Sequence, residues 1–150
     1  MKLKLPPPLI TFVFGLLMYV LAKILPIGAF DFFGRPYLIK GLLFLGVIVA
    51  SIALIQFFRN RTTTDPASPS KATHLVTNGL YNYTRNPMYL AMLLMLLAWG
   101  LWLGNAFNVL VAAGFVSYMN AYQIIPEEKA LGQIFGKAYH HYCVRVRRWF

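Results

Sequence analysis

The chain has 150 residues, of which 59% are hydrophobic and 12% charged, and its formal net charge is +10. So little charge, with the apolar residues in long runs, excludes a soluble globular domain and indicates an integral membrane protein. Because basic residues commonly flank membrane spans, we expect no nucleic-acid partner, and the single cysteine, Cys143, excludes an intrachain disulfide.

The apolar runs predict one domain, residues 1–150, with an all-α fold that is a polytopic membrane helical bundle. We interpret the first run as a retained span, because it is longer than the apolar region of a signal peptide and no small-residue cleavage site follows Pro26. A tight turn at Asn105 joins the third span to the fourth. The four predicted transmembrane helices are residues 9–25, 37–58, 88–104 and 106–125, and a large loop covers residues 59–87.

A further helix, amphipathic in character, is predicted in the tail over residues 127–143. Leu131, Ile134 and Phe135 recur there at helical spacing, and charged side chains fall largely on the other face. We expect this helix to lie against the membrane surface or to fold over the bundle, and we expect Pro126 to end or kink the fourth span.

The basic residues predict the orientation of the chain. They gather before the first span, in the large loop and in the tail, whereas the turn around Asn105 carries no charge. By the positive-inside rule both termini and the large loop are cytoplasmic. The loop and the tail therefore meet on one side of the membrane, where water-soluble cofactors are found.

The end of the large loop, residues 75–89, is polar and aromatic between two apolar halves. Asn86 and Pro87 indicate a helix start, since an Asn side chain can cap the first turn and Pro suits the first helical position. The unpaired N–H groups of that turn, with Arg85 beside them, would attract a carboxylate or a phosphate.

Three tyrosines, Tyr81, Tyr83 and Tyr89, surround the predicted helix start. Their ring faces suit an adenine or a sulfonium cation. The alternative is a loop that crosses the membrane interface, where Tyr and Arg are common in any case.

The first turn of the tail carries Glu127 and Glu128, which are half of the four acidic residues in the chain. They could simply favour the positive end of a helix. However, Ser117, Asn120 and Gln123 step along the fourth span toward Glu127, and polar groups inside a membrane bundle usually face a cavity or a partner. We therefore predict a functional role for Glu127.

Five short motifs occur in a specific order: Gly79-Leu-Tyr81, Arg85-Asn-Pro-Met-Tyr89, Glu127-Glu128, Phe135-Gly-Lys-Ala-Tyr139 and Val146-Arg-Arg-Trp149. Together they resemble the C-terminal half of the isoprenylcysteine carboxyl methyltransferase family, with a similar arrangement in phospholipid methyltransferases. The resemblance covers roughly residues 74–150 and implies a membrane methyltransferase that uses S-adenosylmethionine. The chain has no G-x-G-x-x-G motif, so the cofactor would be held without a Rossmann domain.

Carried over residue by residue, the resemblance implies a cofactor site in which Glu127 accepts the ribose hydroxyls. The helix start beside Arg85 would hold the methionine carboxylate. No metal is expected, and the tail, residues 132–150, is expected to be needed for cofactor affinity. The implied catalytic residues are Arg85, Asn86 and Glu127. The implied cofactor-binding residues are Thr73, His74, Leu75, Val76, Tyr81, Asn86, Pro87, Met88, Tyr89 and Glu127.

The methyl acceptor is open between a carboxylate, an amine and a thiol. Relatives specific for prenylcysteine have an Arg where this chain has Gln123, and the family usually has a His where Asn86 stands. We expect a lipophilic or lipid-linked acceptor that enters between the spans from the membrane lipids. The alternatives are a relative of the NADPH-dependent membrane sterol reductases and a small four-helix transporter or structural membrane protein.

Overall fold

The computed structural model describes residues 5–59 and 75–150. Within these residues the chain forms helices and no strands, apart from one isolated bridge between Ala29 and Asn105. The all-α prediction is therefore confirmed. The helices in chain order are α1 (Pro7–Ile24), η1 (Pro26–Gly28), α2 (Arg35–Arg59), η3 (Gly79–Asn82), α3 (Pro87–Leu103), α4 (Asn108–Met119), η4 (Asn120–Ile124), α5 (Ile125–Phe135) and α6 (Lys137–Arg145).

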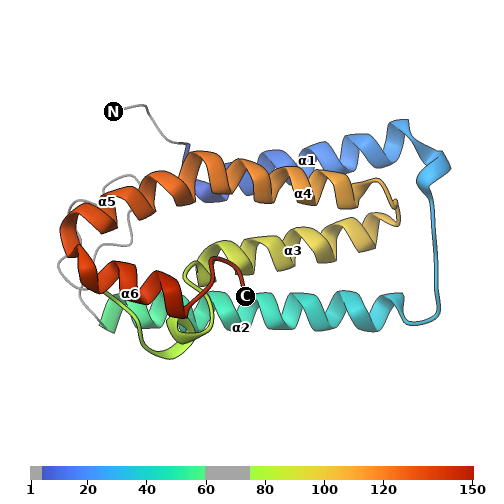
Figure 1. Ribbon diagram of the computed structural model, residues 1–150. Helices are drawn as coiled ribbons and strands as arrows, with labels where there is room; N and C mark the ends of the chain where they lie inside the picture. The colour runs from blue at the N-terminus through green and yellow to red at the C-terminus, as the bar shows by residue number, and fades with distance from the viewer. Residues whose placement is uncertain (1–4, 60–74) are drawn as a thin grey trace.

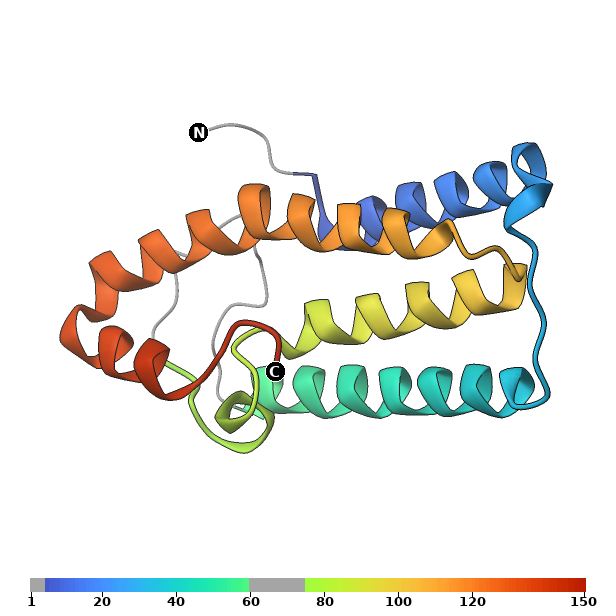
Figure 2. The same cartoon turned by 45° about the vertical axis from the view of Figure 1, so that its right-hand side comes forward.

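Long apolar helices make this an integral membrane protein. Three stretches are long and apolar enough to cross a membrane: α1, the Arg35–Gln56 part of α2, and the continuous helical stretch Asn108–Phe135. The apolar helix α3 is slightly shorter, at 17 residues. It lies between α2 on one side and α1 and α4 on the other, as Figures 1 and 2 show from two directions.

The two ends of α3 have simple local causes. Pro87 occupies the start of the helix, where its missing N–H would have no helical partner. Gly104 ends the helix with φ 65°, a left-handed conformation that glycine adopts without steric cost. Arg35 of α2 satisfies the last carbonyls of α3, because its guanidinium donates to Leu101 O at 2.8 Å and to Trp102 O at 2.7 Å.

The tail decides between two alternatives at Pro126 and overturns one further prediction. First, of the expected end or kink at Pro126, the end is excluded, because the chain stays helical through this residue. The residues before this proline, η4, form a π-helical segment, and such a wider turn relieves the clash that a proline ring makes in a regular α-helix. Second, the single helix predicted over residues 127–143 is wrong, because Gly136 adopts φ 51° and separates α5 from α6.

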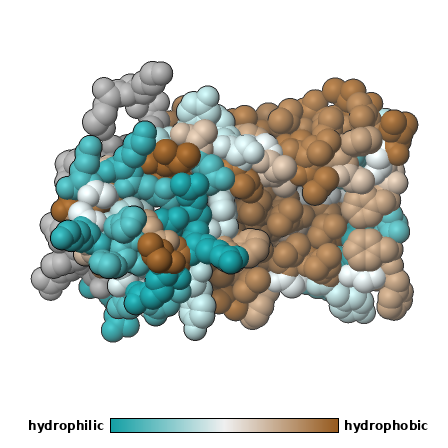
Figure 3. All heavy atoms as spheres, viewed as in Figure 1, coloured by the Kyte–Doolittle hydropathy of each residue, from teal (hydrophilic) through white to brown (hydrophobic). Residues whose placement is uncertain are grey.

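Two clusters of buried side chains hold the fold. The larger one lies inside the bundle, around Met18, Phe115 and Met119, which are all fully buried. The smaller one joins the end of the large loop to α6 through Tyr81, Tyr139, Tyr142 and Val146. Figure 3 shows the corresponding surfaces, apolar over the bundle and hydrophilic over the end formed by α5, α6 and the loop. That hydrophilic end contains the residues that the sequence singles out.

Candidate functional site

The start of α3 meets the start of α5 at the hydrophilic end of the molecule. Tyr89, in the first turn of α3, donates a hydrogen bond from its hydroxyl to Glu127 Oε1 at 2.6 Å. Tyr89 is buried and Glu127 is half-buried. Two residues that lie 38 positions apart in the chain are thus in direct contact, and the helix start and the acidic residue are brought together as expected.

Glu128 links two arginines from different parts of the chain. One of its oxygens lies 3.1 Å from Arg85 Nη2, and both accept hydrogen bonds from Arg148 at 2.8 and 2.9 Å. Arg85 and Glu128 are largely buried, with 12% and 18% of their side chains exposed. The Arg148 contact is bidentate, the geometry in which guanidinium and carboxylate pair most strongly, and it raises the pKa of Arg148.

Arg85 therefore has a different partner from the one expected. The sequence predicts an anion such as the methionine carboxylate, whereas the structure pairs its guanidinium with Glu128 and places Nη1 on the thiol of Cys143. Its Nε is buried, and no described residue accepts a hydrogen bond from it. The backbone N–H of Arg85 donates to Arg147 O at 2.9 Å, which ties the loop to the tail.

Asn86 does not cap α3. Its side chain makes no capping hydrogen bond and donates instead to Arg148 O at 3.0 Å. Thr84 Oγ1 donates to the same carbonyl at 3.1 Å and accepts from Asn86 N at 3.2 Å. The Asn86 amide therefore ties the start of α3 to the returning tail through its Nδ2 group, and its Oδ1 makes no capping bond.

The aromatic residues divide into two groups. Tyr81 and Tyr89 are buried at the site, whereas Tyr83 is 78% exposed. Gly79, with φ 61°, makes a turn and leaves room for Gln56 of α2. Tyr142 donates its hydroxyl to Tyr81 O at 2.7 Å. Burial raises the pKa values of Tyr81 and Tyr142 above their usual range.

The other residues implied by the resemblance are placed as follows. Leu75 and Val76 pack against the cluster of Tyr81, Tyr139, Tyr142 and Val146. Pro87 is buried and Met88 is half-buried. Thr73 and His74 lie outside the described residues.

The polar residues along the fourth span contact different partners. Ser117 donates to Ala113 O of its own helix, and Asn120 accepts from Trp149 Nε1 at 3.1 Å. Gln123, which is fully buried, donates to Leu5 O at 2.7 Å. The polar residues predicted to line the fourth span therefore bond to separate parts of the chain: the tail, the N-terminal segment and, through Glu127, α3.

Thr84 is a member of the site that the sequence does not single out, and it contributes through its bond to the tail. Glu128, Arg148 and Trp149 belong to motifs of the resemblance, but the sequence predicts no partners for them. Their contacts require the tail to return to the start of α3. His140 and His141 are exposed on α6 and do not take part.

Comparison with known proteins identifies relatives. The family model described as phospholipid methyltransferase matches residues 37–138, about two thirds of the chain. An uncharacterized protein of Haemophilus influenzae is 48% identical over 62 residues, which cover 41% of this chain and 98% of that protein. The protein-S-isoprenylcysteine O-methyltransferase of Schizosaccharomyces pombe is 29% identical over 106 residues, 71% of this chain and 45% of that enzyme. No solved structure matches the chain.

Proposed function

Because the chain belongs to the phospholipid methyltransferase family, we propose that it is a membrane enzyme that methylates a lipophilic acceptor with S-adenosylmethionine. The observation that carries the proposal is the contact between Tyr89 and Glu127. It places an acidic side chain against the start of α3, where polar and aromatic groups from the loop and the tail also gather.

The residues present fit this cofactor. Glu127 provides carboxylate oxygens, which have enough lone pairs to accept from ribose hydroxyls as well as from Tyr89. Arg85 provides a buried Nε donor that no described residue uses, and a carboxylate is the natural acceptor for it. Tyr81 and Tyr89 provide ring surface beside these groups.

Methyl transfer mainly requires the protein to align the methyl donor with the acceptor. When bound, S-adenosylmethionine supplies an electrophilic methyl group on a sulfonium. The side chains at the start of α3 and α5 would orient the acceptor for in-line displacement, and the tail would keep water out. A carboxylate acceptor needs no general base, whereas an amine or a thiol must lose a proton. We propose an acceptor that enters from the membrane lipids, because the apolar bundle adjoins the site.

The placement of the site also favours the orientation predicted from the basic residues. Arg85, Arg147 and Arg148 all lie at the hydrophilic end, together with the tail. The positive-inside rule puts this end, and with it both termini, in the cytoplasm. The cofactor would then reach the site from the aqueous side.

The decisive experiment measures binding of S-adenosylmethionine to the protein in detergent by calorimetry, with NADPH as the comparison ligand. We expect binding of S-adenosylmethionine only. Glu127→Gln should weaken it by about ten- to a hundredfold, the effect of losing charged hydrogen bonds of about 1.5–3 kcal/mol.

The matched control is Asp31→Asn, which removes an acidic side chain that is 80% exposed at the other end of the molecule. It should leave the affinity unchanged. Binding of NADPH instead would point to a reductase, and binding of neither ligand would favour a transporter or a structural protein. Transfer of a labelled methyl group into a lipid extract would then identify the acceptor.

A further inference from the structure

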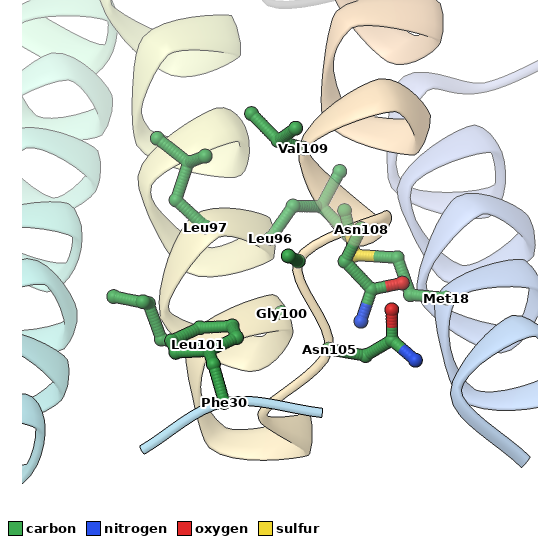
Figure 4. Close-up of a pocket in the computed structure, with 10 residues that line it drawn as sticks. Met18, Phe30, Leu96, Leu97, Gly100, Leu101, Asn105, Asn108 and Val109 are labelled. Carbon is green, nitrogen blue, oxygen red and sulfur yellow. The ribbon is translucent and has the colours of Figure 1, made fainter. Parts of the chain in front are cut away.

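A pocket of about 320 Å³ lies between α1, α3 and α4, at the end of the bundle opposite the candidate site (Figure 4). Its lining is mostly apolar and includes Met18, Leu97 and Leu101. Val109, which also lines it, is 64% exposed, so the pocket reaches the surface of the bundle. Asn108 and Glu127 are 19 residues apart on one continuous helical stretch, roughly 28 Å along the axis, so the pocket is separate from the site described above.

Asn108 is the unusual member of this lining. It is only 3% exposed, and neither its Nδ2 nor its Oδ1 has a hydrogen-bond partner among the described residues. Figure 4 shows its amide group pointing from α4 into the space beside α3. A buried amide that leaves both a donor and an acceptor unpaired is costly, and native proteins rarely keep one without a reason.

The neighbouring Asn105, in contrast, has hydrogen-bond partners for both atoms of its side-chain amide. Its Nδ2 donates to Leu25 O at 2.6 Å, and its Oδ1 accepts from Phe107 N at 3.0 Å. These bonds fasten the turn between α3 and α4 to the end of α1. Asn108 makes no such bond, so a role in fastening the turn does not account for its side chain.

Gly100 keeps space open beside the Asn108 amide. A side-chain carbon at this position of α3 would lie 3.2 Å from Asn108 Cβ and 3.8 Å from the sulfur of Met18. The contact with Asn108 is tighter than ordinary packing and the contact with Met18 is ordinary, so a side chain at this position would crowd Asn108. The absence of a side chain at Gly100 therefore matters to the shape of the pocket and to access to Asn108.

We propose that this pocket binds a neutral membrane lipid that carries a hydroxyl group, with the hydroxyl on Asn108. A hydroxyl donates and accepts at once, so it can pair with Oδ1 and Nδ2 together. An ester or an ether would leave Oδ1 unpaired, and a carboxylate or an ammonium group would carry a charge into an apolar lining. The exposed apolar faces of α1 and α4 place the opening in contact with lipid tails, from which such a molecule would enter.

The test uses the full chain in lauryldimethylamine oxide, a detergent without a hydroxyl group. The probes are hexadecan-1-ol, its methyl ether and hexadecane, and the readouts are native mass spectrometry and thermal stability. We expect the alcohol to bind at least tenfold more tightly than the alkane and to raise Tm by a few degrees, with the ether in between. Equal binding of alcohol and alkane would overturn the proposal.

Two variants distinguish the hydroxyl contact from non-specific hydrophobic binding. Asn108→Leu should bind alcohol and alkane alike, and its Tm without a probe should be equal to or above that of the wild type, because an unpaired buried amide has been removed. Gly100→Ala keeps Asn108 but narrows the pocket beside it, and it should also weaken alcohol binding. A fall in Tm for Asn108→Leu without a probe would mean that water satisfies the amide, and the proposal would be wrong.

Ser117→Ala is the matched control, because it removes from the same helix a hydroxyl that already donates to Ala113 O. It should bind the alcohol as the wild type does. All of these variants should keep the affinity for S-adenosylmethionine, because the pocket lies at the opposite end of the bundle from the candidate site. The lipid proposal is therefore independent of the proposed methyltransferase function. Persistence of alcohol selectivity in Asn108→Leu would also refute the assignment.

Discussion

Tyr89 donates a hydrogen bond of 2.6 Å to Glu127 at the candidate site. We expect Tyr89→Phe to weaken binding of S-adenosylmethionine by about three- to tenfold, because Glu127 loses a bond that orients its carboxylate. This indirect effect, about 0.5–1.5 kcal/mol, is smaller than the loss of a direct charged hydrogen bond to the cofactor. The effect should be smaller than that of Glu127→Gln, since the carboxylate itself remains. Calorimetry in detergent measures both.

The control for this prediction is Tyr83→Phe. It removes the same hydroxyl from a side chain that is 78% exposed, and it should leave the affinity unchanged. If the two variants bound the cofactor equally well, Tyr89 would have no positioning role.

At the residue scale, the sequence predicts which residues gather at the site better than it predicts which groups they bond to. Pro87 begins α3 as expected, because the proline geometry is local. The partners of Arg85 and Asn86 come from α5 and the tail, because Glu128 lies 43 residues after Arg85 and Arg148 lies 62 residues after Asn86. No local pattern can reveal that Arg148 O accepts from the Asn86 side chain, or that Glu128 pairs with Arg85.

Gly136 decides the shape of the tail at the scale of elements. With φ 51° and ψ −122° it occupies a region that other residues rarely adopt, and a side chain added there would meet no neighbour within 4 Å. We expect Gly136→Ala to be destabilising by about 1–3 kcal/mol, because the cost is purely conformational. The variant should favour one continuous helix and detach α6 from the loop, which lowers both Tm and cofactor affinity.

Gly132→Ala is the matched control, four residues earlier and inside α5. A side chain there would lie in ordinary contact with Tyr139 at 3.9 Å, so the change should stabilise the helix slightly, by up to about 1 kcal/mol. Thermal unfolding and circular dichroism of the two variants, measured side by side, test the difference. A Gly136→Ala protein as stable as Gly132→Ala would contradict it.

The long elements are the most predictable part of the fold. The first two spans, predicted at residues 9–25 and 37–58, are observed as Pro7–Ile24 and Arg35–Arg59, because runs of apolar residues dictate them. The break at Gly136 lies outside what periodicity reveals, since the apolar spacing continues across it. The helical passage through Pro126 is also invisible locally, because the π-helical segment η4 that accommodates it depends on packing along the fourth span.

For the whole molecule, the buried tyrosines predict a loss of stability at alkaline pH. Burial raises the pKa values of Tyr81, Tyr139 and Tyr142 above the ordinary value of 10.0. Above pH 10 the unfolded chain therefore loses phenol protons that the folded protein retains, so the free energy of unfolding falls as pH rises. Below pH 10 both states are protonated and this contribution is fully present.

Tm measured in detergent between about pH 8 and 11 tests this linkage. Tyr139→Phe removes one titration and should make the decline less steep, whereas the exposed Tyr83→Phe should not. Equal slopes for the two variants would show that ionisation of the buried phenols does not set the alkaline limit.

The last five residues of the chain close the candidate site. Val146 is buried against Tyr81, and the residues after it reach Arg85, Asn86, Glu128 and Asn120. A chain that stops after Arg145 should keep its bundle, because the larger buried cluster contains only Trp149 from this segment. Its affinity for S-adenosylmethionine should fall by at least about tenfold, since Glu128 and Arg85 lose the groups that order them.

Removal of Phe150 alone, a residue 81% exposed, is the control and should leave this affinity unchanged. Circular dichroism checks that the helices persist, and a shortened chain that binds the cofactor as well as the full chain would show that the tail is not part of the site.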